Sequence, residues 1–475
     1  MRTNSSRRRF LQQLSLLSGG LATASFAHAV PGIDQPRSAH SENVEGVSPR
    51  PINAGYMGGF RAPKIDRVRI CMIGVGERGF PHTAQLSVIE GVEIVGICDV
   101  HQDLANRAAE YVHKKTGHLP AAYCNGEQDY LRMIKDMRPD AVIISTSWEW
   151  HAPMAIDAMN NGAHAFVEVP LALTIKELWN IIDTSERTRK HCMMMENVNY
   201  GRDELLFLNM VRQGIIGELL HGEAAYIHEL RMQMKSENRG CGSWRNYHYA
   251  ARNGNLYPTH GLGPVAQYMN IARKEDLFSR IVSFGSPAKG RAAYAKANFP
   301  EGHKWNELEY VCGDINTSII KTNLGRTILV QWDETSPRPY SRSNLIQGTL
   351  GTLAGYPEPM VAGEKLGDGN YHKWLKGRDE LAPIYEKYDH PLYKRLGDLA
   401  VKMGGHGGMD FIMLSRIVEC LRNGEPLDQN VYEGAFWSAV GPLSEKSVAE
   451  NGMPQLFPDF TRGDWKTTEP LSIIQ

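Results

Sequence analysis

A glycine-rich turn followed at a set distance by an acid is the clearest sign of chemistry in this chain. Residues 68–73 form a short apolar, β-rich run that leads into Gly74-Val-Gly76-Glu77-Arg78-Gly79. In a strand, turn and helix unit these glycines allow a tight turn, close approach of a pyrophosphate to the backbone, and packing of helix on strand. A second β-rich run, residues 92–98, ends at Asp99, twenty residues beyond Gly79. An acid there accepts both ribose hydroxyls and repels a 2′-phosphate, so these residues favour NAD over NADP.

The elements around this turn predict a doubly wound parallel sheet. Further strand-like runs at 140–145, 164–169 and 192–196 alternate with helix-like stretches at 101–115, 153–160 and 175–189. Ligands bind such sheets at the carboxyl ends of the strands. The motifs found where these runs stop are Trp148-Glu-Trp-His151, Glu168-Val-Pro170 and Glu196-Asn-Val-Asn-Tyr200.

The second half of the chain has a different character. After a helix at about residues 203–213, the strand-like runs 315–321, 327–332 and 344–348 follow one another without helices between them. A mostly antiparallel second sheet is the simplest account. We therefore expect an α/β protein, with an N-terminal Rossmann domain at 67–200 and an α+β substrate domain at 201–475. Late helices at 409–421 and 432–450 should pack against both domains.

Several longer motifs resemble those of one carbohydrate-active family. The glycine turn, Asp99, a Glu-x-Pro after strand five and the second sheet are similar to the glucose-fructose oxidoreductase and inositol dehydrogenase family. Within it, the chain resembles glycoside hydrolase family 109, the NAD-dependent α-N-acetylgalactosaminidases, from about residue 68 to residue 465. Besides residues 148–151 and 196–200, the motifs are Trp244-Arg-Asn-Tyr-His248, Leu256-Tyr-Pro-Thr-His-Gly261, Arg338-Pro-Tyr340, Gly405-His-Gly-Gly-Met-Asp410 and Pro442-Leu-Ser-Glu-Lys-Ser447.

One residue separates this chain from the wider dehydrogenase family. That family usually has Glu-Lys-Pro after strand five, where the lysine moves a proton, whereas this chain has Glu168-Val169-Pro170. Valine cannot move a proton, which argues against an ordinary dehydrogenase and is in keeping with the glycosidase branch. The alternative function is a sugar oxidoreductase with tightly bound NAD(P), and a third is a sugar-binding protein without catalysis.

The resemblance implies a redox route to hydrolysis. Bound NAD takes hydride from C3 of the sugar, the C2 proton and the glycosidic oxygen leave, water adds, and the hydride returns. We expect His260 to be the base at the C3 hydroxyl, because imidazole titrates near neutral pH, although a loop histidine can equally be a surface residue. Tyr200 is the candidate C2 base and would need a lowered phenol pKa; the alternative is a tyrosine that closes a strand-end turn.

The remaining site residues are also carried over from the resemblance. Sugar contacts are expected at Arg245, Tyr257, Pro258, Thr259 and Tyr340, with a surface ion pair or core aromatics as alternatives. Cofactor contacts are expected at Gly74, Gly76, Glu77, Arg78, Gly79, Asp99, Trp148, Glu149, Trp150, His151, Glu168, Val169 and Asn197. His406 and His248 stay open between ligand contact and local structure. No HExxH or similar ligand cluster occurs, so no metal is expected.

The N-terminus has the order of an export signal. Residues 1–29 hold four arginines and no acid, then an apolar run from Leu11 to Phe26, then Ala27-His-Ala29 as a cleavage site. Ser6-Arg-Arg-Arg-Phe-Leu11 resembles the twin-arginine signal, which carries folded proteins to the periplasm. A disordered basic tail is the alternative. Residues 30–66 contain many prolines and glycines and predict an exposed linker or arm.

Composition limits the class of partner. Lys and Arg total 52 against 53 for Asp and Glu, so the charge balance does not indicate a nucleic-acid-binding or membrane-surface protein. The apolar run of the signal is too short for stable membrane insertion. Seven cysteines without a CxxC pair suggest buried thiols rather than disulfides. The expected partners are a small glycoside or glycan and the twin-arginine export machinery; whether the protein is a homo-oligomer is left open.

Overall fold

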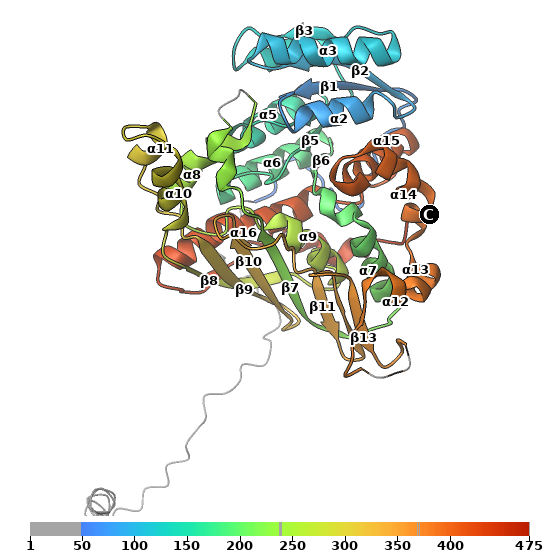
Figure 1. Ribbon diagram of the computed structural model, residues 1–475. Helices are drawn as coiled ribbons and strands as arrows, with labels where there is room; N and C mark the ends of the chain where they lie inside the picture. Colours follow the sequence, from blue (N-terminus) through green and yellow to red (C-terminus); the bar gives the residue numbers. More distant parts are fainter. Residues whose placement is uncertain (1–48, 237–239, 368, 370, 475) are drawn as a thin grey trace, which may run out of the picture. The chain divides into compact units, whose positions relative to one another are not determined.

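A computed structural model describes residues 49–236, 240–367, 369 and 371–474 (Figure 1). The predicted signal peptide at 1–29, and residues 30–48 of the expected linker, lie outside the described residues. The described part belongs to one compact unit, Gly46–Gln475, that contains two sheets.

The first sheet has six parallel strands in the order β3-β2-β1-β4-β5-β6. β1 pairs with both β2 and β4, so the strand order reverses there and a crevice forms at the carboxyl ends. β4 and β5 are buried throughout, as expected for strands with helices on both faces. The strands are β1 Val68–Ile73, β2 Val92–Cys98, β3 Ala121–Tyr123, β4 Ala141–Ile144, β5 His164–Val167 and β6 Cys192–Met194. The helices are α2 Gly79–Leu86, α3 Gln102–Thr116, α4 Asp129–Met137, α5 Trp148–Asn160 and α6 Ile175–Thr188.

The predicted Rossmann topology is confirmed, with differences in detail. β3 and α4 were not predicted, because β3 is a three-residue edge strand in which Ala121 and Ala122 are exposed. Residues 148–151, predicted as the end of a strand, form the first turn of α5, which begins five residues before the predicted start at Pro153. The functional motif is therefore held by a helix rather than by a loop.

The second sheet has nine strands in the order β14-β13-β12-β11-β7-β10-β9-β8-β15. Every neighbouring pair is antiparallel except β7 and β10, which confirms a mostly antiparallel sheet. Strand β7 itself was not predicted, since the first strand recognised in this half was residues 315–321. The strands are β7 Leu219–Ile227, β8 Phe278–Gly285, β9 Ile315–Thr322, β10 Thr327–Asp333, β11 Leu345–Gly348, β12 Gly351–Ala354, β13 Met360–Gly363, β14 Leu375–Lys376 and β15 Gln455–Leu456.

Helices from the second half connect the two sheets (Figure 1). α15 packs against α2 and β1, and α16 packs against α6, β6 and β8, so both late helices contact both domains as predicted. α9 covers β7. The helices are α7 Arg202–Arg212, α8 Arg245–Ala251, α9 Thr259–Tyr268, α10 Gly290–Asn298, α11 Lys304–Glu307, α12 Gly377–Glu380, α13 Ala382–Tyr388, α14 Pro391–Met403, α15 Met409–Asn423 and α16 Val431–Ala449.

The core runs through the region where α16 meets both sheets. Phe436 and Trp437 of α16 are at most 1% exposed, because Rossmann elements lie on one side of the helix and β8 on another. The helix starts with a capping box: the Asn430 side chain accepts the amide of Glu433, and the Glu433 carboxylate accepts the amide of Asn430. This cap fixes where α16 begins and hence how it joins the domains.

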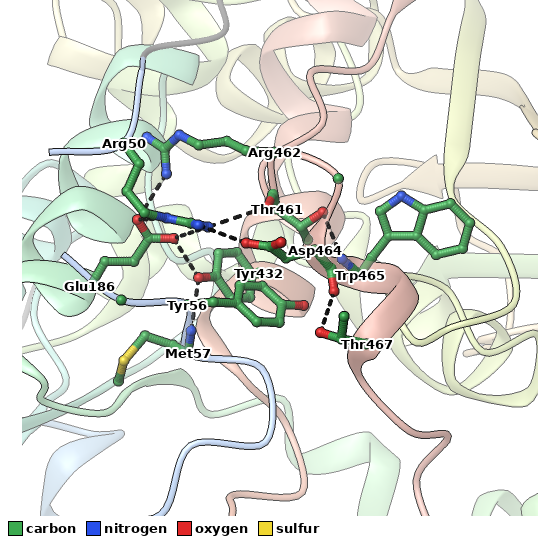
Figure 2. Close-up of polar contacts among 12 residues, drawn as sticks. Arg50, Tyr56, Met57, Glu186, Tyr432, Thr461, Arg462, Asp464, Trp465 and Thr467 are labelled. Atoms are coloured by element: carbon green, nitrogen blue, oxygen red, sulfur yellow. Dashed lines mark hydrogen bonds and ion pairs between the residues drawn. The ribbon is translucent and has the colours of Figure 1, made fainter. Parts of the chain in front are cut away.

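Several of residues 49–66 are exposed, as expected for a linker or arm, but Arg50, Tyr56 and Met57 contact the rest of the protein, which corrects the prediction at these positions (Figure 2). Glu186 of α6 is fully buried and pairs with Arg50 and Arg462, each at 2.9 Å. Tyr432 donates to the same carboxylate at 2.5 Å, and its ring stacks on Tyr56 with centroids 4.8 Å apart. Arg50 thus supplies a charged contact between this segment and a buried carboxylate.

Candidate functional site

A cavity of about 650 Å³ lies at the carboxyl ends of the Rossmann strands and extends to residues of the second domain. This volume lies in the range of small-molecule sites. Twelve of the thirteen expected cofactor residues line it: Gly74, Gly76, Glu77, Arg78, Asp99, Trp148, Glu149, Trp150, His151, Glu168, Val169 and Asn197. The structure thus brings together residues from five separate places in the sequence.

The thirteenth residue, Gly79, lies outside the cavity lining and packs against the glycine turn. A Cβ atom on Gly79 would lie 1.8 Å from the carbonyl oxygen of Gly74, so only glycine lets α2 approach the turn after β1. Gly74 itself has a φ of +78°, which favours glycine. On the outer side, the Gly240 carbonyl accepts a hydrogen bond from the Glu77 amide at 2.9 Å. The turn has the tight backbone geometry that a dinucleotide requires.

Asp99 directly follows β2 and is held in place by backbone donors. Its two oxygens accept the amides of Val75 and His101, each at 2.9 Å. Since each carboxylate oxygen has a second lone pair, Asp99 can also accept ribose hydroxyls at the edge of the cavity. The glycine turn, the N-terminus of α2 and Asp99 together fit an NAD molecule.

Glu168, at the end of β5, belongs to an ion-pair network beneath the cavity. Its Oε1 atom accepts from Arg78 Nε and His82 Nε2, both at 2.6 Å. Burial raises the pKa of Glu168, but the Arg78 charge and the His82 hydrogen bond outweigh it and lower the pKa to about 2. Val169 is buried at the lining position where a dehydrogenase would carry its lysine.

Asp410 of α15 joins this network from the second half of the chain. It accepts from Arg78 at 2.8 Å, Asn197 at 2.7 Å and His406 at 2.8 Å. Despite burial, the His406 hydrogen bond and the Arg78 charge hold its pKa well below the usual range. His406 lines the cavity and lies in the glycine-rich turn before α15, so its contact with a ligand stays a prediction.

His260 stands on the opposite wall, in the first turn of α9. Its Nδ1 lies 2.7 Å from Oε1 of Glu196, a fully buried residue two positions beyond the end of β6. Glu196 also accepts the Val198 amide at 3.1 Å. Glu196 was not among the expected site residues, although an acid beyond a strand's carboxyl end was a signal that could have found it.

Arg245 lies among aromatic rings beside the cavity. Its guanidinium is 4.7 Å from the Trp244 ring and 5.5 Å from the Trp148 ring. No carboxylate of the described residues forms an ion pair with it, so its donors are available to a ligand. Tyr257 also lines the cavity, with its ring 5.0 Å from that of His260. Both of these expected sugar contacts therefore line the cavity.

Three expected sugar contacts lie off the cavity lining. Pro258 and Thr259 sit at the start of α9, with Thr259 buried in its first turn. Tyr340 is 39% exposed; its ring is 4.8 Å from that of His228, next to the wall but not part of the lining. His248 is likewise off the lining and bonds Glu149 at 3.4 Å, which favours its local structural role.

Tyr200 does not have the surroundings of a C2 base, which corrects that prediction. It is 3% exposed, lies outside the cavity lining, and donates to Asp428 at 3.1 Å. Burial and the Asp428 charge raise the pKa of Tyr200 well above its ordinary value, the opposite of what a base requires. The alternative expectation, a tyrosine that closes the turn after β6, describes its place in the η1 turn, Asn197–Tyr200.

Among the lining residues that the sequence reasoning missed are Tyr226, His228 and Glu334. Tyr226 lies near the end of β7, which was not recognised as a strand, His228 directly follows β7, and Glu334 follows β10. The Tyr226 ring is central, with centroids 4.6 Å from Tyr257 and 5.3 Å from His260.

In the described residues, no helix is long and apolar enough to cross a membrane. The same residues contain no group of three or more His, Cys, Asp or Glu side chains that could hold a metal ion.

Comparisons with known proteins agree with the geometry. Residues 68–196 match the model described as the oxidoreductase family, NAD-binding Rossmann fold, and residues 200–467 match the glycosyl hydrolase 109 C-terminal domain. Among solved structures, levoglucosan dehydrogenase in complex with NADH and levoglucosan has a TM-score of 0.63 at 19% identity, covering 83% of this chain and all of that one. Scyllo-inositol dehydrogenase from Lactobacillus casei, with bound NAD(H) and scyllo-inositol, has a TM-score of 0.57 at 13% identity, covering 82% and 99%. The likeness to these two dehydrogenase structures shows that the chain shares their fold.

Curated relatives match over the whole length. Glycosyl hydrolase family 109 protein 1 of Akkermansia muciniphila is 68% identical and covers 100% of both chains. A protein of Shewanella oneidensis named alpha-N-acetylgalactosaminidase is 55% identical, covering 99% of both. The expected family and fold are therefore confirmed, and the chain belongs to glycosyl hydrolase family 109, as an NAD-dependent glycoside hydrolase whose N-terminal domain is an NAD-binding Rossmann domain.

Proposed function

We propose that this enzyme removes terminal α-linked N-acetylgalactosamine by oxidation, elimination, addition and reduction. The observation that carries the proposal is that one cavity joins the glycine turn and Asp99 to His260 and Arg245. The Shewanella oneidensis relative named alpha-N-acetylgalactosaminidase supports the choice of sugar. Val169 supports hydrolysis over net oxidation, since the dehydrogenases' lysine is absent there.

When bound, NAD would supply the hydride acceptor and donor at C3 of the sugar. His260 removes the C3 hydroxyl proton: Glu196 binds Nδ1, so the Nε2 lone pair is available to the sugar. The ketone at C3 makes the C2 proton acidic, and its loss expels the glycosidic oxygen from C1. Water then adds at C1, the C2 proton is restored, and C3 is reduced again.

Arg245 and the aromatic rings around it bind the sugar. Its guanidinium donates to carbonyl and hydroxyl oxygens, which suits an acetamido sugar. The rings of Trp148 and Tyr257 supply flat apolar surfaces for the sugar's C–H face and keep water from the reacting carbons.

A chromogenic α-N-acetylgalactosaminide assay without added cofactor tests the function. We expect colour from the protein as purified, and none from the matched β-linked substrate. The same reaction run in heavy water should give N-acetylgalactosamine with deuterium at C2, whereas direct two-carboxylate displacement leaves C2 untouched. Hydrolysis without C2 deuterium contradicts the redox route. No hydrolysis, with net oxidation of free sugar, favours the alternative of a sugar oxidoreductase with tightly bound NAD(P).

The proposal includes a periplasmic location. The Ser6-Arg-Arg-Arg-Phe-Leu11 motif and the apolar run after it support export by the twin-arginine route. This route carries folded proteins, so the NAD site can be loaded in the cytoplasm before export. Glycans outside the cytoplasm would then be the substrates.

A further inference from the structure

We propose that His228 is the residue that takes the proton from C2 of the sugar and later returns it. This inference rests on the proposed redox route, in which two protons leave neighbouring carbon positions. His260 accounts for one of them, and Tyr200, outside the cavity lining, does not account for the other.

The position of His228 suits this role. It follows the last residue of β7 and lines the cavity on the same wall as Arg245, Tyr257 and His260. Its Nδ1 lies 2.9 Å from the Tyr226 hydroxyl, and its ring meets the Tyr340 ring edge-on at 4.8 Å. These contacts fix the imidazole from two sides. Within the described chain its Nε2 atom forms no hydrogen bond, which leaves that nitrogen for a ligand.

The Tyr226 ring contacts both imidazoles. The ring is 5.5 Å from the His228 ring and 5.3 Å from the His260 ring. Two bases that contact the same ring can act on neighbouring positions of one sugar without competing for the same proton. The arrangement matches the need for one base at the C3 hydroxyl and another at C2.

The other ionisable groups on this wall are unsuited to accept a proton. Glu334 is buried, accepts from Tyr249, and lies 3.5 Å from Arg291. Burial raises the pKa of Tyr226 and of Tyr257 well above the ordinary value of tyrosine, and Arg245 stays charged. His228 and His260 are the remaining candidates on the wall.

The two histidines differ in their partners, and so in their chemistry. Nδ1 of His260 contacts the carboxylate of Glu196, whereas Nδ1 of His228 contacts the neutral hydroxyl of Tyr226. Burial and the nearby His260 and His406 lower the pKa of His228, which favours its neutral imidazole. In the tautomer that donates Nδ1–H to the Tyr226 oxygen, Nε2 carries the lone pair and can accept a proton.

The step balances as follows. The C2–H bond breaks and the proton moves to Nε2 of His228. The electron pair of the C2–H bond forms the C1–C2 double bond, and the C1–O bond pair leaves with the glycosidic oxygen, which takes a proton from a water molecule and leaves hydroxide. That hydroxide adds to C1, and Nε2 returns its proton to C2, so that one water is consumed.

The test compares His228→Asn with His221→Asn. Asparagine keeps a polar group near the place of Nδ1 and lacks Nε2. His221 is on the same strand, bonds Thr327 at 2.8 Å and lies off the cavity lining, so it is the matched control. Each purified protein is incubated with N-acetylgalactosamine in heavy water. C2 exchange is followed by NMR, and C3 oxidation by the absorbance of reduced nicotinamide.

We expect His228→Asn to lose about 10²- to 10⁴-fold in C2 exchange while reduced nicotinamide still forms, and His221→Asn to match the parent. A His228→Gln variant, with a polar group near Nε2 that cannot take a proton, should behave like His228→Asn. If C2 exchange stays near the parent rate in either His228 variant, the role of His228 is overturned while the redox route stands. Loss of C3 oxidation together with loss of C2 exchange also overturns that role. A parent enzyme that hydrolyses without any C2 exchange overturns the redox route as well.

Discussion

His260 Nδ1 lies 2.7 Å from Oε1 of Glu196, and this contact determines which nitrogen of the histidine can act as a base. An ionised carboxylate only accepts hydrogen bonds, so Nδ1 must carry the hydrogen and Nε2 keeps its lone pair. Glu196 is fully buried, and its Oε2 has no hydrogen-bond partner among the described residues. The carboxylate is thus committed to orienting His260.

Glu196→Gln should abolish most of the hydrolysis without loss of cofactor. The Gln amide can donate to Nδ1 and so favours the wrong tautomer, in which Nε2 carries the hydrogen. We expect kcat to fall by about 10²- to 10⁴-fold, as for other carboxylates that fix a catalytic histidine, with little change in KM. The measurement is steady-state hydrolysis of the chromogenic substrate, with NAD content checked after denaturation.

Glu445→Gln is the matched control, since Glu445 pairs with Arg252 away from the cavity lining. It should keep activity near that of the parent. If Glu196→Gln also stays within a few-fold of the parent, His260 does not depend on its carboxylate.

The purified protein should retain NAD in near-equal molar amount. Asp99 completes a site in which the glycine turn and the N-terminus of α2 bind the pyrophosphate, and an exported enzyme would meet no cytoplasmic pool. Asp99→Asn should release part of the NAD on dialysis, because the amide weakens the hydrogen bonds to the ribose. Chromatography of the supernatant after denaturation measures the NAD content of the parent and of the dialysed variant. Absence of dinucleotide, or mainly NADP, from the parent protein would contradict the assignment.

Glu168 should make the fold sensitive to acid. Its pKa of about 2 is depressed from the ordinary 4.5, so the folded state is stabilised by the ionised form. That contribution is complete above about pH 4.5 and is lost as the pH falls towards about 2. Urea unfolding at several pH values should show a smaller acid-dependent loss in Glu168→Gln than in the parent. Equal losses would mean that the Arg78 and His82 contacts do not stabilise the fold.

The cofactor half of the site was predictable because its signals are local. The glycine turn, Asp99 and the motifs at 148–151 and 168–169 each follow a strand, and parallel strands bring their carboxyl ends to one edge. The sugar half was not, because it depends on where β7 and α9 lie. Residues 219–227 carry no clear alternation, so His228 had no element to place it. Glu196 and His260 are 64 residues apart, and spacing alone cannot bring them together.

The same limit applies to Tyr200 and to residues 49–66. Tyr200 was chosen by its place in a motif, but the chain turns it towards Asp428, 228 residues further on. The composition of residues 49–66 predicts exposure, and the tertiary partners Glu186 and Asp464 explain why Arg50 is held there. Local sequence patterns predict helices and strands, whereas buried polar pairs between distant residues are known only from the tertiary structure.

Export should depend on the arginine cluster. Replacing Arg7, Arg8 and Arg9 together by lysine keeps the charge and removes the feature that the twin-arginine route reads. We expect the precursor to collect in the cytoplasm with its NAD bound and its activity intact. Fractionation with immunoblotting checks this, and an unchanged periplasmic share in the variant would contradict the proposed location.

Glu186→Gln should destabilise the whole fold, because Glu186 is the buried centre of the contacts that hold residues 49–66 (Figure 2). The neutral amide takes one carboxylate partner from Arg462, which keeps Asp183, and one from Arg50, which keeps Asp464. Removing one member of a buried ion pair costs about 3 to 5 kcal/mol in the free energy of unfolding, and the retained partners should bring the cost towards the lower end of that range. Asp464→Asn removes the half-exposed partner of Arg50 and should cost less than about 1 kcal/mol. Urea unfolding of both variants measures the difference, and equal costs would show that residues 49–66 are held by their apolar contacts instead.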